Sequence, residues 1–531
     1  MKHTSRTTIR TYRYAFSLIA VALTFLMNSS AFAENFFLFL PGNLVVSRSV
    51  YDNNPGNITV GETLPPGCTS GCGVATDNGT YPEVFNNDLA DGSFGITSKI
   101  FLDEITPFGF RFGSLEVPTN APGGPVVTSF SSKSEMALNL STDRRFLTFM
   151  GYNAPVDSVD VSNSNTPGVV DPTNPVPSSF FRAVAQVDAF GRFQFTATNA
   201  YSGNNGRAAI FNDAADAYYT AGNAGNGNNP QPVGVILGAG AQFISPADLK
   251  LSIQDPGTPS PLASFSITDL PVNKKPDKVG KDDNFRGLTI FDNVVYYTKG
   301  SGSNGINTVY FVDTTGTACP DGVGLPVAGA TLPTSPLAFN PATVATDGLP
   351  SNMCVLSGFN TTLAKTSTTA FPFGLWFANA NTLYVADEGD GTLPDAGTSS
   401  TAGLQKWTFN SSTSSWQLAY VLQKGLGLGV PYTVAGYPTG VNAATGLAWA
   451  PETDGLRNIT GIVEHNGFAT IYGITSTVSG SGDQGADPNR LVAITDQLSA
   501  TTLPAPESFQ TVCSAGFGEV LRGVSWTPDL F

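Results

Sequence analysis

The stretch RGLTIF-DN-VVYYT at residues 286–298 decides the fold. Two runs rich in apolar, β-branched and aromatic residues flank Asp292-Asn293, a pair that favours a tight turn between antiparallel strands. A second copy is FGLWF (373–377), which is followed after a short turn by LYVAD (383–387). The hairpin recurs about six times, at intervals of roughly 65 to 90 residues. A fixed repeat of short strands predicts a closed array, and the array that fits best is a β-propeller.

The repeat is a cycle of four strands. Its first strand is an apolar run behind a small residue, with copies at 136–140, 208–211, 287–291, 374–377, 458–463 and 523–526. The second strand follows a tight turn at 145–149, 216–220, 294–298, 383–387 and 469–473. The third lies at 99–109, 183–191, 308–316, 403–409 and 490–498, and the fourth at, for example, 192–198 and 416–422. No long segment after residue 33 has helical spacing of apolar residues.

These strands predict an all-β chain, a β-propeller with six four-stranded blades. Seven blades stay possible, because segments 225–280 and 445–450 could hold a further set of strands. The last copy of the first strand, at 523–526, has no partners after it, whereas 43–47, 99–103 and 113–118 look like second, third and fourth strands without a first. We therefore expect one blade to be built from both ends of the chain, which closes the ring and removes its open edges.

Residues 1–33 have the pattern of a secretory signal. Four basic residues precede an apolar core at 15–27, and Ala31-Phe32-Ala33 resembles a cleavage site. No later stretch approaches the roughly 20 apolar residues of a membrane-spanning helix. The sequence thus predicts an exported protein, secreted or periplasmic, in which residues 34–531 form a single propeller domain.

The charge balance limits the partners. The chain has 26 basic and 41 acidic residues, and removal of segment 1–33 leaves 22 basic residues against the same 41. Such an excess of negative charge disfavours nucleic acid and anionic membranes, because both are polyanions. We expect a monomer that binds an anionic small molecule, a saccharide or a protein, with no nucleic acid and no membrane span.

Three stretches rich in Pro, Gly, Asn, Ser and Thr interrupt the cycle at 52–95, 154–178 and 317–370, and we interpret them as surface loops. Two contain cysteine pairs. Cys68 with Cys72 could close a small loop, and Cys319 with Cys354 could join the two ends of the third stretch, which leaves Cys513 over. An exported chain permits such disulfides.

Several segments resemble those of a widespread group of exported, mostly uncharacterised bacterial β-propeller proteins. The matching segments are GNLVVSRSVYD (42–52), IFLDEITPFG (100–109), SEMALNLSTDRRFLTFMGYNA (134–154), AYSGNNGRAAIF (200–211), TLYVADEGDG (382–391) and LRGVSW (521–526). The resemblance covers most of the chain after the signal. Its motifs mark strands and turns rather than catalytic groups, so it implies a propeller fold and export and implies no activity.

The residue at the start of each first strand should point towards one mouth of the central channel. These residues are Glu135, Arg207, Arg286, Phe373, Arg457 and Arg522. Four arginines at equivalent places could form an anion-binding funnel, because guanidinium groups bind carboxylate, phosphate or sulfate through paired hydrogen bonds. The alternative is that each arginine joins blades, by pairing with Asp103, Asp188, Asp313 or Asp496 of the third strands or with a neighbouring blade.

A second candidate site is the acidic loop Asp387-Glu388-Gly389-Asp390-Gly391. Alternating carboxylates on a glycine-rich turn can hold Ca²⁺, although the spacing is not that of an EF-hand and the loop could simply be solvated. We expect no other cofactor. His465 is the one histidine after the signal and lies in a predicted turn, which excludes a Ser-His-Asp triad and a multi-histidine metal site.

Two functions are compatible with these residues. The leading hypothesis is an exported, non-enzymatic propeller that binds a ligand or partner on its arginine-bearing face. The alternative is a histidine-independent hydrolase or lyase acting on a lactone or acidic saccharide, with Glu135 and Asp387 as the catalytic groups beside the arginines.

Overall fold

The computed structural model describes part of the chain. The described residues are 37–530 without 53, 55, 57–58, 65–72, 75–94, 121–124, 131, 133–134, 168, 170–179, 224–239, 248–250, 253–283, 301–304, 320, 338–351, 365–369, 394–395, 443–445 and 481–484. Residues 39–531 form one compact unit, distinct from residues 1–38. The predicted signal at 1–33, and Cys68 and Cys72, lie outside the described residues.

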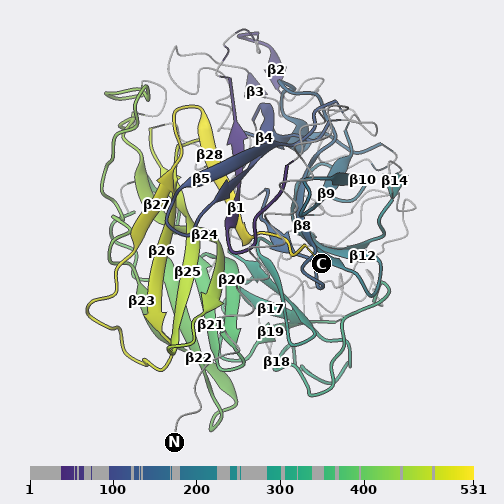
Figure 1. The fold of residues 1–531 in the computed structure, drawn as a ribbon, viewed down its shortest axis with the longest axis vertical. Helices are drawn as coiled ribbons and strands as arrows, with labels where there is room; N and C mark the ends of the chain where they lie inside the picture. The colour runs from purple at the N-terminus through teal and green to yellow at the C-terminus, as the bar shows by residue number, and fades with distance from the viewer. Residues whose placement is uncertain are drawn as a thin grey trace, which may run out of the picture. The chain divides into compact units, whose positions relative to one another are not determined.

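The unit is a β-propeller of six blades with almost no helix in its described part (Figure 1). Blade 1 contains β28 (Glu519–Trp526), β1 (Leu44–Val50), β4 (Thr97–Ile105) and β5 (Arg111–Glu116), with β6 (Thr128–Ser129) paired to β4. Blade 2 contains β7 (Asn139–Leu140), β8 (Phe146–Tyr152), β9 (Arg182–Asp188) and β10 (Phe193–Thr198), with β14 (Leu251–Ser252) parallel to β10. Blade 3 contains β11 (Gly206–Asn212), β12 (Ala217–Gly222) and β13 (Ala241–Ile244).

The other three blades follow in chain order. Blade 4 contains β15 (Leu288–Phe291), β16 (Val294–Lys299), β17 (Thr308–Val312) and β19 (Met353–Leu356), with β18 (Val323–Gly324) parallel to β19. Blade 5 contains β20 (Pro372–Asn379), β21 (Thr382–Asp387), β22 (Gly403–Asn410) and β23 (Ser415–Leu422). Blade 6 contains β24 (Glu452–Val463), β25 (Phe468–Val478), β26 (Arg490–Gln497) and β27 (Gln510–Ser514). A separate ribbon joins β2 (Thr63–Leu64) to β3 (Gly73–Val74), and η2 (Val161–Asn163) is a 3₁₀ turn.

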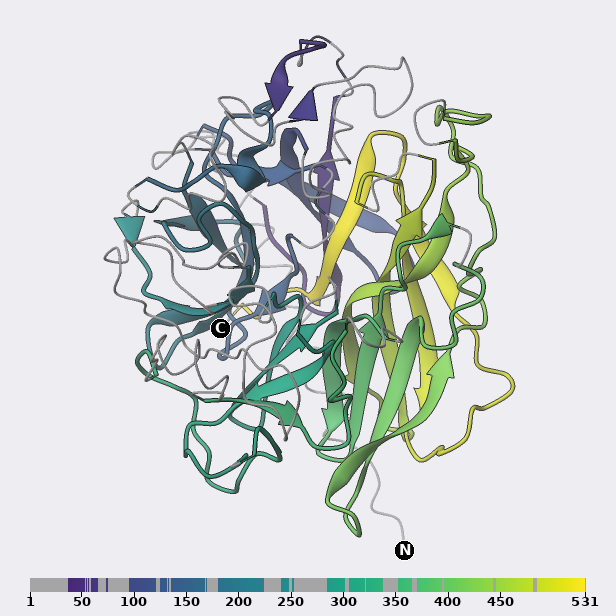
Figure 2. The ribbon, with the colours of Figure 1, turned by 180° about the vertical axis from the view of Figure 1, so that it is seen from behind.

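The predicted closure of the ring is confirmed. β28 pairs antiparallel with β1, from Leu44 opposite Trp526 to Val50 opposite Glu519, so one blade combines both ends of the chain. In Figure 2 the yellow β28, the last strand of the chain, lies beside the purple β1, the first strand of the chain. The blade count is six, and the seven-blade alternative is not realised, because the described strands of 225–280 are the outer strands β13 and β14 of blades 3 and 2.

The predicted loop 317–370 also contains strands. β19 is the fourth strand of blade 4 and pairs antiparallel with β17, while β18 adds a parallel edge. The sequence pattern did not predict β19, because its four residues, MCVL, lie within a long Pro- and Gly-rich stretch. The range 52–95 likewise contains the ribbon β2–β3.

The hydrophobic core lies between adjacent blades. Neighbouring side chains on one strand point to opposite faces of the sheet, and here both faces are covered. Tyr297 is buried in the cluster shared by blades 3 and 4, whereas the adjacent Tyr296 is buried in the cluster shared by blades 4 and 5. This arrangement explains why VVYYT is apolar or aromatic at nearly every position instead of alternating with polar residues.

Short hydroxyl side chains connect adjacent blades near the axis. Thr298 accepts a hydrogen bond from Gly287 N–H at 2.8 Å, and its Oγ1 donates to the carbonyl of Phe373 in the next blade. Ser47 does the same in blade 1, where it accepts from Gly523 N–H and donates to the carbonyl of Met136, both at 2.8 Å. A Cβ on Gly287 would collide with the Phe373 carbonyl. The small residue at the start of each first strand therefore permits the next blade to approach.

Loss of the Thr298 hydroxyl should destabilise the ring. We expect Thr298→Val to lower the free energy of unfolding by about 1–3 kcal/mol, because it leaves a buried N–H and a buried carbonyl without this partner. Thr298→Ser keeps the hydroxyl, as Ser47 does in blade 1, and should retain most of the stability. Urea unfolding followed by circular dichroism measures both variants, and equal stability of the two would contradict this role for the hydroxyl.

Candidate functional site

The residues predicted to form the anion-binding funnel are all buried. Relative exposure is 0% for Glu135 and Phe373 and no more than 7% for the four arginines, Arg207, Arg286, Arg457 and Arg522. Three of the arginines lie close enough to influence one another. Burial lowers the pKa of Arg207 well below its usual value, and the charge of Arg286 lowers it further. Burial likewise lowers the pKa of Arg286 to about 10, with Glu388 opposing this shift and Arg457 adding to it.

Two of these arginines make contacts between blades. Arg457 Nε of blade 6 lies 3.2 Å from Glu388 Oε2, directly after the last residue of β21 in blade 5. Arg207 Nη1 of blade 3 donates to the carbonyl of Phe285, before blade 4, at 2.7 Å. Arg522 of blade 1 donates to the carbonyl of Phe130. The contacts of Arg207 and Arg457 therefore join neighbouring blades, as in the alternative interpretation, whereas Arg522 bonds to the residue that follows β6 of its own blade. Anion binding by this set stays a prediction.

The four third-strand aspartates have other partners. Asp103 forms an ion pair with Arg48 at 2.6 Å, and Asp188 pairs with Arg192 at 2.5 Å. Asp496 pairs with the fully buried Lys406 at 2.8 Å. Asp313 accepts three N–H groups of the turn that follows it, those of Thr315, Gly316 and Ala318.

The two carboxylates of the enzymatic hypothesis are also enclosed. Glu135 accepts hydrogen bonds from Thr128 Oγ1 at 2.8 Å, from Ser129 N–H at 3.2 Å and from the hydroxyl of Tyr152. Burial raises the pKa of Tyr152, and the negative charge of Glu135 raises it further. Asp387 accepts from the N–H groups of Phe371 and Gly389 and from Gln405 Nε2, at 2.8 to 3.0 Å.

The acidic loop does not gather its carboxylates around one point. Glu388 faces Arg457, the carboxylate of Asp387 is held by the donors just described, and the exposed Asp390 accepts from the N–H of Thr392. Among the described residues, the one group of three potential metal ligands within 4.8 Å is Asp313, Cys319 and Cys354. Calcium binding by Asp387, Glu388 and Asp390 stays a prediction from the sequence.

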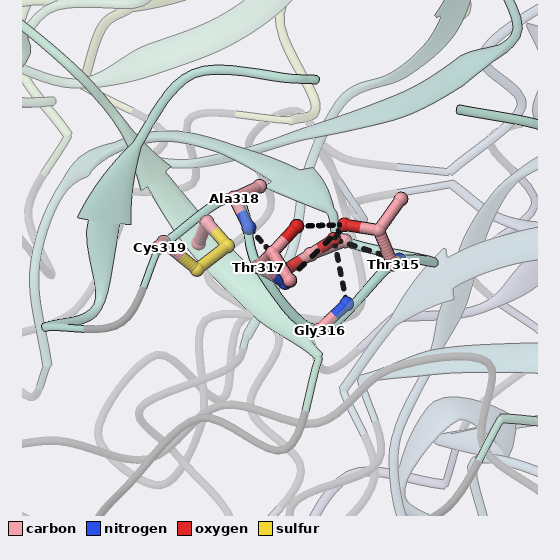
Figure 3. Close-up of a disulfide and its surroundings, with 7 residues drawn as sticks. Thr315, Gly316, Thr317, Ala318 and Cys319 are labelled. Carbon is pink, nitrogen blue, oxygen red and sulfur yellow. Dashed lines mark hydrogen bonds between the residues drawn. A yellow bond between two sulfur atoms is a disulfide. The ribbon is translucent and has the colours of Figure 1, made fainter. Parts of the chain in front are cut away.

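The predicted Cys319–Cys354 disulfide is confirmed, with a Cα–Cα distance of 5.9 Å. Figure 3 shows it beside the turn 315–318. Cys513 is a free thiol whose pKa burial raises to about 11, so it is a weak nucleophile at neutral pH. No helix in the described part of the chain is both long and apolar enough to cross a membrane.

A cavity lies further along the inner strands and begins at the residues that directly follow Arg286, Phe373 and Arg457. It has a volume of about 580 Å³, and residues of all six inner strands line it. The lining residues are Ala137–Thr142, Arg144, Ile210, Gly287–Ile290, Asp292, Asn293, Leu332, Gly374–Trp376, Asn458–Gly461, Ser525 and Trp526. We call it the axial cavity.

Two indole rings and several uncharged polar groups give the axial cavity its chemistry. Trp376 and Trp526 are half-buried, and Trp526 Nε1 donates to the carbonyl of Gly461 at 2.9 Å. Gly461 is needed because a Cβ there would lie 2.7 Å from the ring of Trp376. Thr289 and Thr460 belong to the same lining. The lining thus combines two indole side chains with residues that can form hydrogen bonds.

Our sequence interpretation missed the axial cavity, because it followed the residues at the start of the first strands. The signal was present three or four positions later. Thr289, Trp376, Thr460 and Trp526 are polar or bulky aromatic residues within short runs that are otherwise small or aliphatic.

Comparisons with known proteins identify no family. No family model matches the chain, and no curated protein matches it, so the resemblance to exported bacterial propellers stays an expectation. One similar solved structure is that of extracellular domains 1–2 of Drosophila semaphorin 1a. It shares 11% identity over 75% of this chain and 63% of that chain, with a TM-score of 0.18. The chain spans less than two thirds of that structure, and a likeness this low carries no argument.

The free energy of unfolding should depend on pH through the buried carboxyl group of Asp387. Burial raises its pKa from about 3.8 to about 6. The folded protein therefore binds this proton more tightly than the unfolded chain, and the contribution to the free energy of unfolding falls as pH rises through this window. We expect the fall to be on the order of 2–3 kcal/mol.

Urea unfolding at pH 4, 5, 6 and 7 measures this contribution. Asp387→Asn should remove it, so that the variant's stability declines less from pH 4 to pH 6 than that of the wild type. Asp390→Asn removes an exposed charge on the same loop that adds to the pKa shift of Asp387, so it should reduce the decline less than Asp387→Asn does. The same pH profile for Asp387→Asn and the wild type would show that this carboxyl group does not titrate in the window.

Proposed function

We propose that this protein is an exported, non-enzymatic propeller that binds a saccharide in its axial cavity. The observation that supports this most directly is the lining, in which Trp376 and Trp526 accompany Thr289 and Thr460. A sugar ring has an apolar C–H face that packs on an indole and a rim of hydroxyls that bond to polar side chains. Small-ligand cavities typically have a lining rich in aromatic side chains and a small number of polar groups that orient the ligand.

The charge of the lining favours binding over hydrolysis. Among the described residues that line the axial cavity, Asp292 is the one carboxylate, and glycoside hydrolysis ordinarily uses two. The one basic residue, Arg144, forms an ion pair with Asp529 at 3.2 Å. The cavity is therefore better suited to an uncharged ligand than to an acidic one.

The disulfide supports the export part of the proposal. Disulfides form and persist in oxidising compartments, and Cys319–Cys354 lies in a chain whose residues 1–33 have the pattern of a secretory signal. Anion binding at the arginine end is the second candidate ligand class. It is supported by four arginines at equivalent positions, and stabilisation by phosphate, sulfate or sugar acids in a thermal-shift assay tests it.

Isothermal titration with a panel of neutral oligosaccharides tests the main proposal. We expect at least one to bind, and Trp376→Ala to weaken its binding by about tenfold or more, because the stacking face is lost. Thr460→Val should weaken it by about fivefold through the loss of one hydrogen bond. Thr495→Val alters an exposed threonine outside the cavity and serves as the matched control.

Two outcomes would count against saccharide binding in this cavity. One is the absence of heat with every neutral and acidic sugar tested. The other is a sugar that binds Trp376→Ala and the wild type with equal affinity.

A further inference from the structure

A second cavity lies beside the axial cavity, between blades 4 and 5. Its volume is about 410 Å³, and the turn Asp292-Asn293 lines both cavities. We call it the aromatic pocket, because five aromatic residues line it: Phe291, Tyr296, Phe377, Phe409 and Trp416. Segment Leu325–Ala330 forms its outer wall. No residue of this pocket belongs to the sites considered above except the shared turn.

The aromatic rings of the pocket hold one another in place. Phe291 stacks on Phe377 with ring centroids 4.6 Å apart and planes at 12°, and Tyr296 contacts Phe377 at the same distance. Trp416 meets the edges of Phe377 and Phe409 at 5.8 and 5.6 Å. Because each ring is packed against at least one other, the pocket is formed before any ligand arrives.

The pocket is electrically negative. Asp292 is the one charged residue in the described lining, and it is exposed at the rim. Its charge reaches into the pocket, where it adds to the effect of burial in raising the pKa of Tyr296. Aromatic faces carry partial negative charge and attract cations, particularly ammonium groups with an apolar surface. The excess of 15 acidic residues in the whole chain acts in the same direction.

The outer wall is fixed to blade 4 by backbone bonds and by the disulfide. Val355 N–H donates to the carbonyl of Gly322 at 2.9 Å, and Ser357 N–H donates to that of Gly324 at 2.8 Å. These bonds join β18 to β19, directly before segment Leu325–Ala330. The Cys319–Cys354 disulfide links the turn that precedes β18 to β19 (Figure 3). The wall can therefore stay in place although it belongs to a long loop.

We propose that the aromatic pocket binds an organic cation, an ammonium group carried on an apolar body. The aromatic rings contact the apolar substituents of the ligand and attract its positively charged ammonium group. The Asp292 carboxylate at the rim balances that charge. This site takes a ligand class different from that of the axial cavity and does not depend on saccharide binding.

Isothermal titration with phenyltrimethylammonium, and with choline against its neutral analogue 3,3-dimethylbutan-1-ol, tests the proposal. We expect phenyltrimethylammonium to bind, and choline to bind at least about tenfold more tightly than the alcohol. Asp292→Asn should weaken cation binding by about fivefold or more and leave the fold intact, because asparagine tolerates the positive φ of 48° at this position.

A filling variant locates the site. Ala380 is exposed and lines the pocket, so Ala380→Trp should abolish cation binding without altering the core. His465→Trp places the same side chain on the corresponding exposed turn of blade 6, outside both cavities, and should bind like the wild type. No binding of phenyltrimethylammonium, equal binding of choline and the alcohol, or unchanged binding by Ala380→Trp would each overturn the proposal.

Reduction of the disulfide tests the role of the outer wall. Under dithiothreitol, or in the double variant Cys319→Ser with Cys354→Ser, we expect cation affinity to fall at least about fivefold, because the wall is then held by the short β18–β19 pairing alone. Far-ultraviolet circular dichroism checks that the blades remain folded. Unchanged cation affinity in a protein shown to be fully reduced would contradict the role assigned to the disulfide.

Discussion

The close approach of six inner strands around one axis is the constraint on which the rest of the structure depends. Close to the axis, a side chain that points from an inner strand towards the next blade would collide with the backbone of that blade. Gly287, Gly374 and Gly523 avoid the collision, since a Cβ on each would contact Phe373, Arg457 and Met136 backbone atoms respectively. The space that remains is narrow enough for a single hydroxyl, from Thr298 or Ser47, to bond to both blades. Packing and hydrogen bonding thus fix each blade against its neighbour.

The same crowding gives the two ends of the axis different properties. At the start of the inner strands, long arginine side chains fill the space and bond across to the adjacent blade, as Arg457 does with Glu388. Removing one partner of a buried pair is costly, because the other charge is left without compensation. Loss of either Arg457 or Glu388 would therefore weaken the contact between blades 5 and 6. Towards the carboxyl ends, the inner strands carry shorter or flatter side chains, and a cavity of about 580 Å³ remains.

Much of the fold could be predicted from the sequence, because its repeat is regular. The hairpin spacing correctly indicated six blades and a ring closed by β28 beside β1, since strand periodicity and turn chemistry are local signals. The short β19 was missed, because a four-residue strand in a Pro- and Gly-rich stretch owes its structure to pairing with β17 rather than to local preference. The candidate site was harder to predict. The alignment of the repeated first strands identified which arginines are equivalent. Their burial and their partners, however, depend on side chains from other blades.

The hairpin turn Asp292-Asn293 connects the two cavities. Asp292 and Asn293 both adopt positive φ, of 48° and 60°, which is the geometry of the tight hairpin turn and explains why these residue types occupy it. Because β15 is an inner strand, this turn projects between the axial cavity and the aromatic pocket and lines both. An asparagine would serve the turn equally well at the first position. The aspartate adds a negative charge that the backbone does not require, and its carboxylate is the one found among the described lining residues of either cavity.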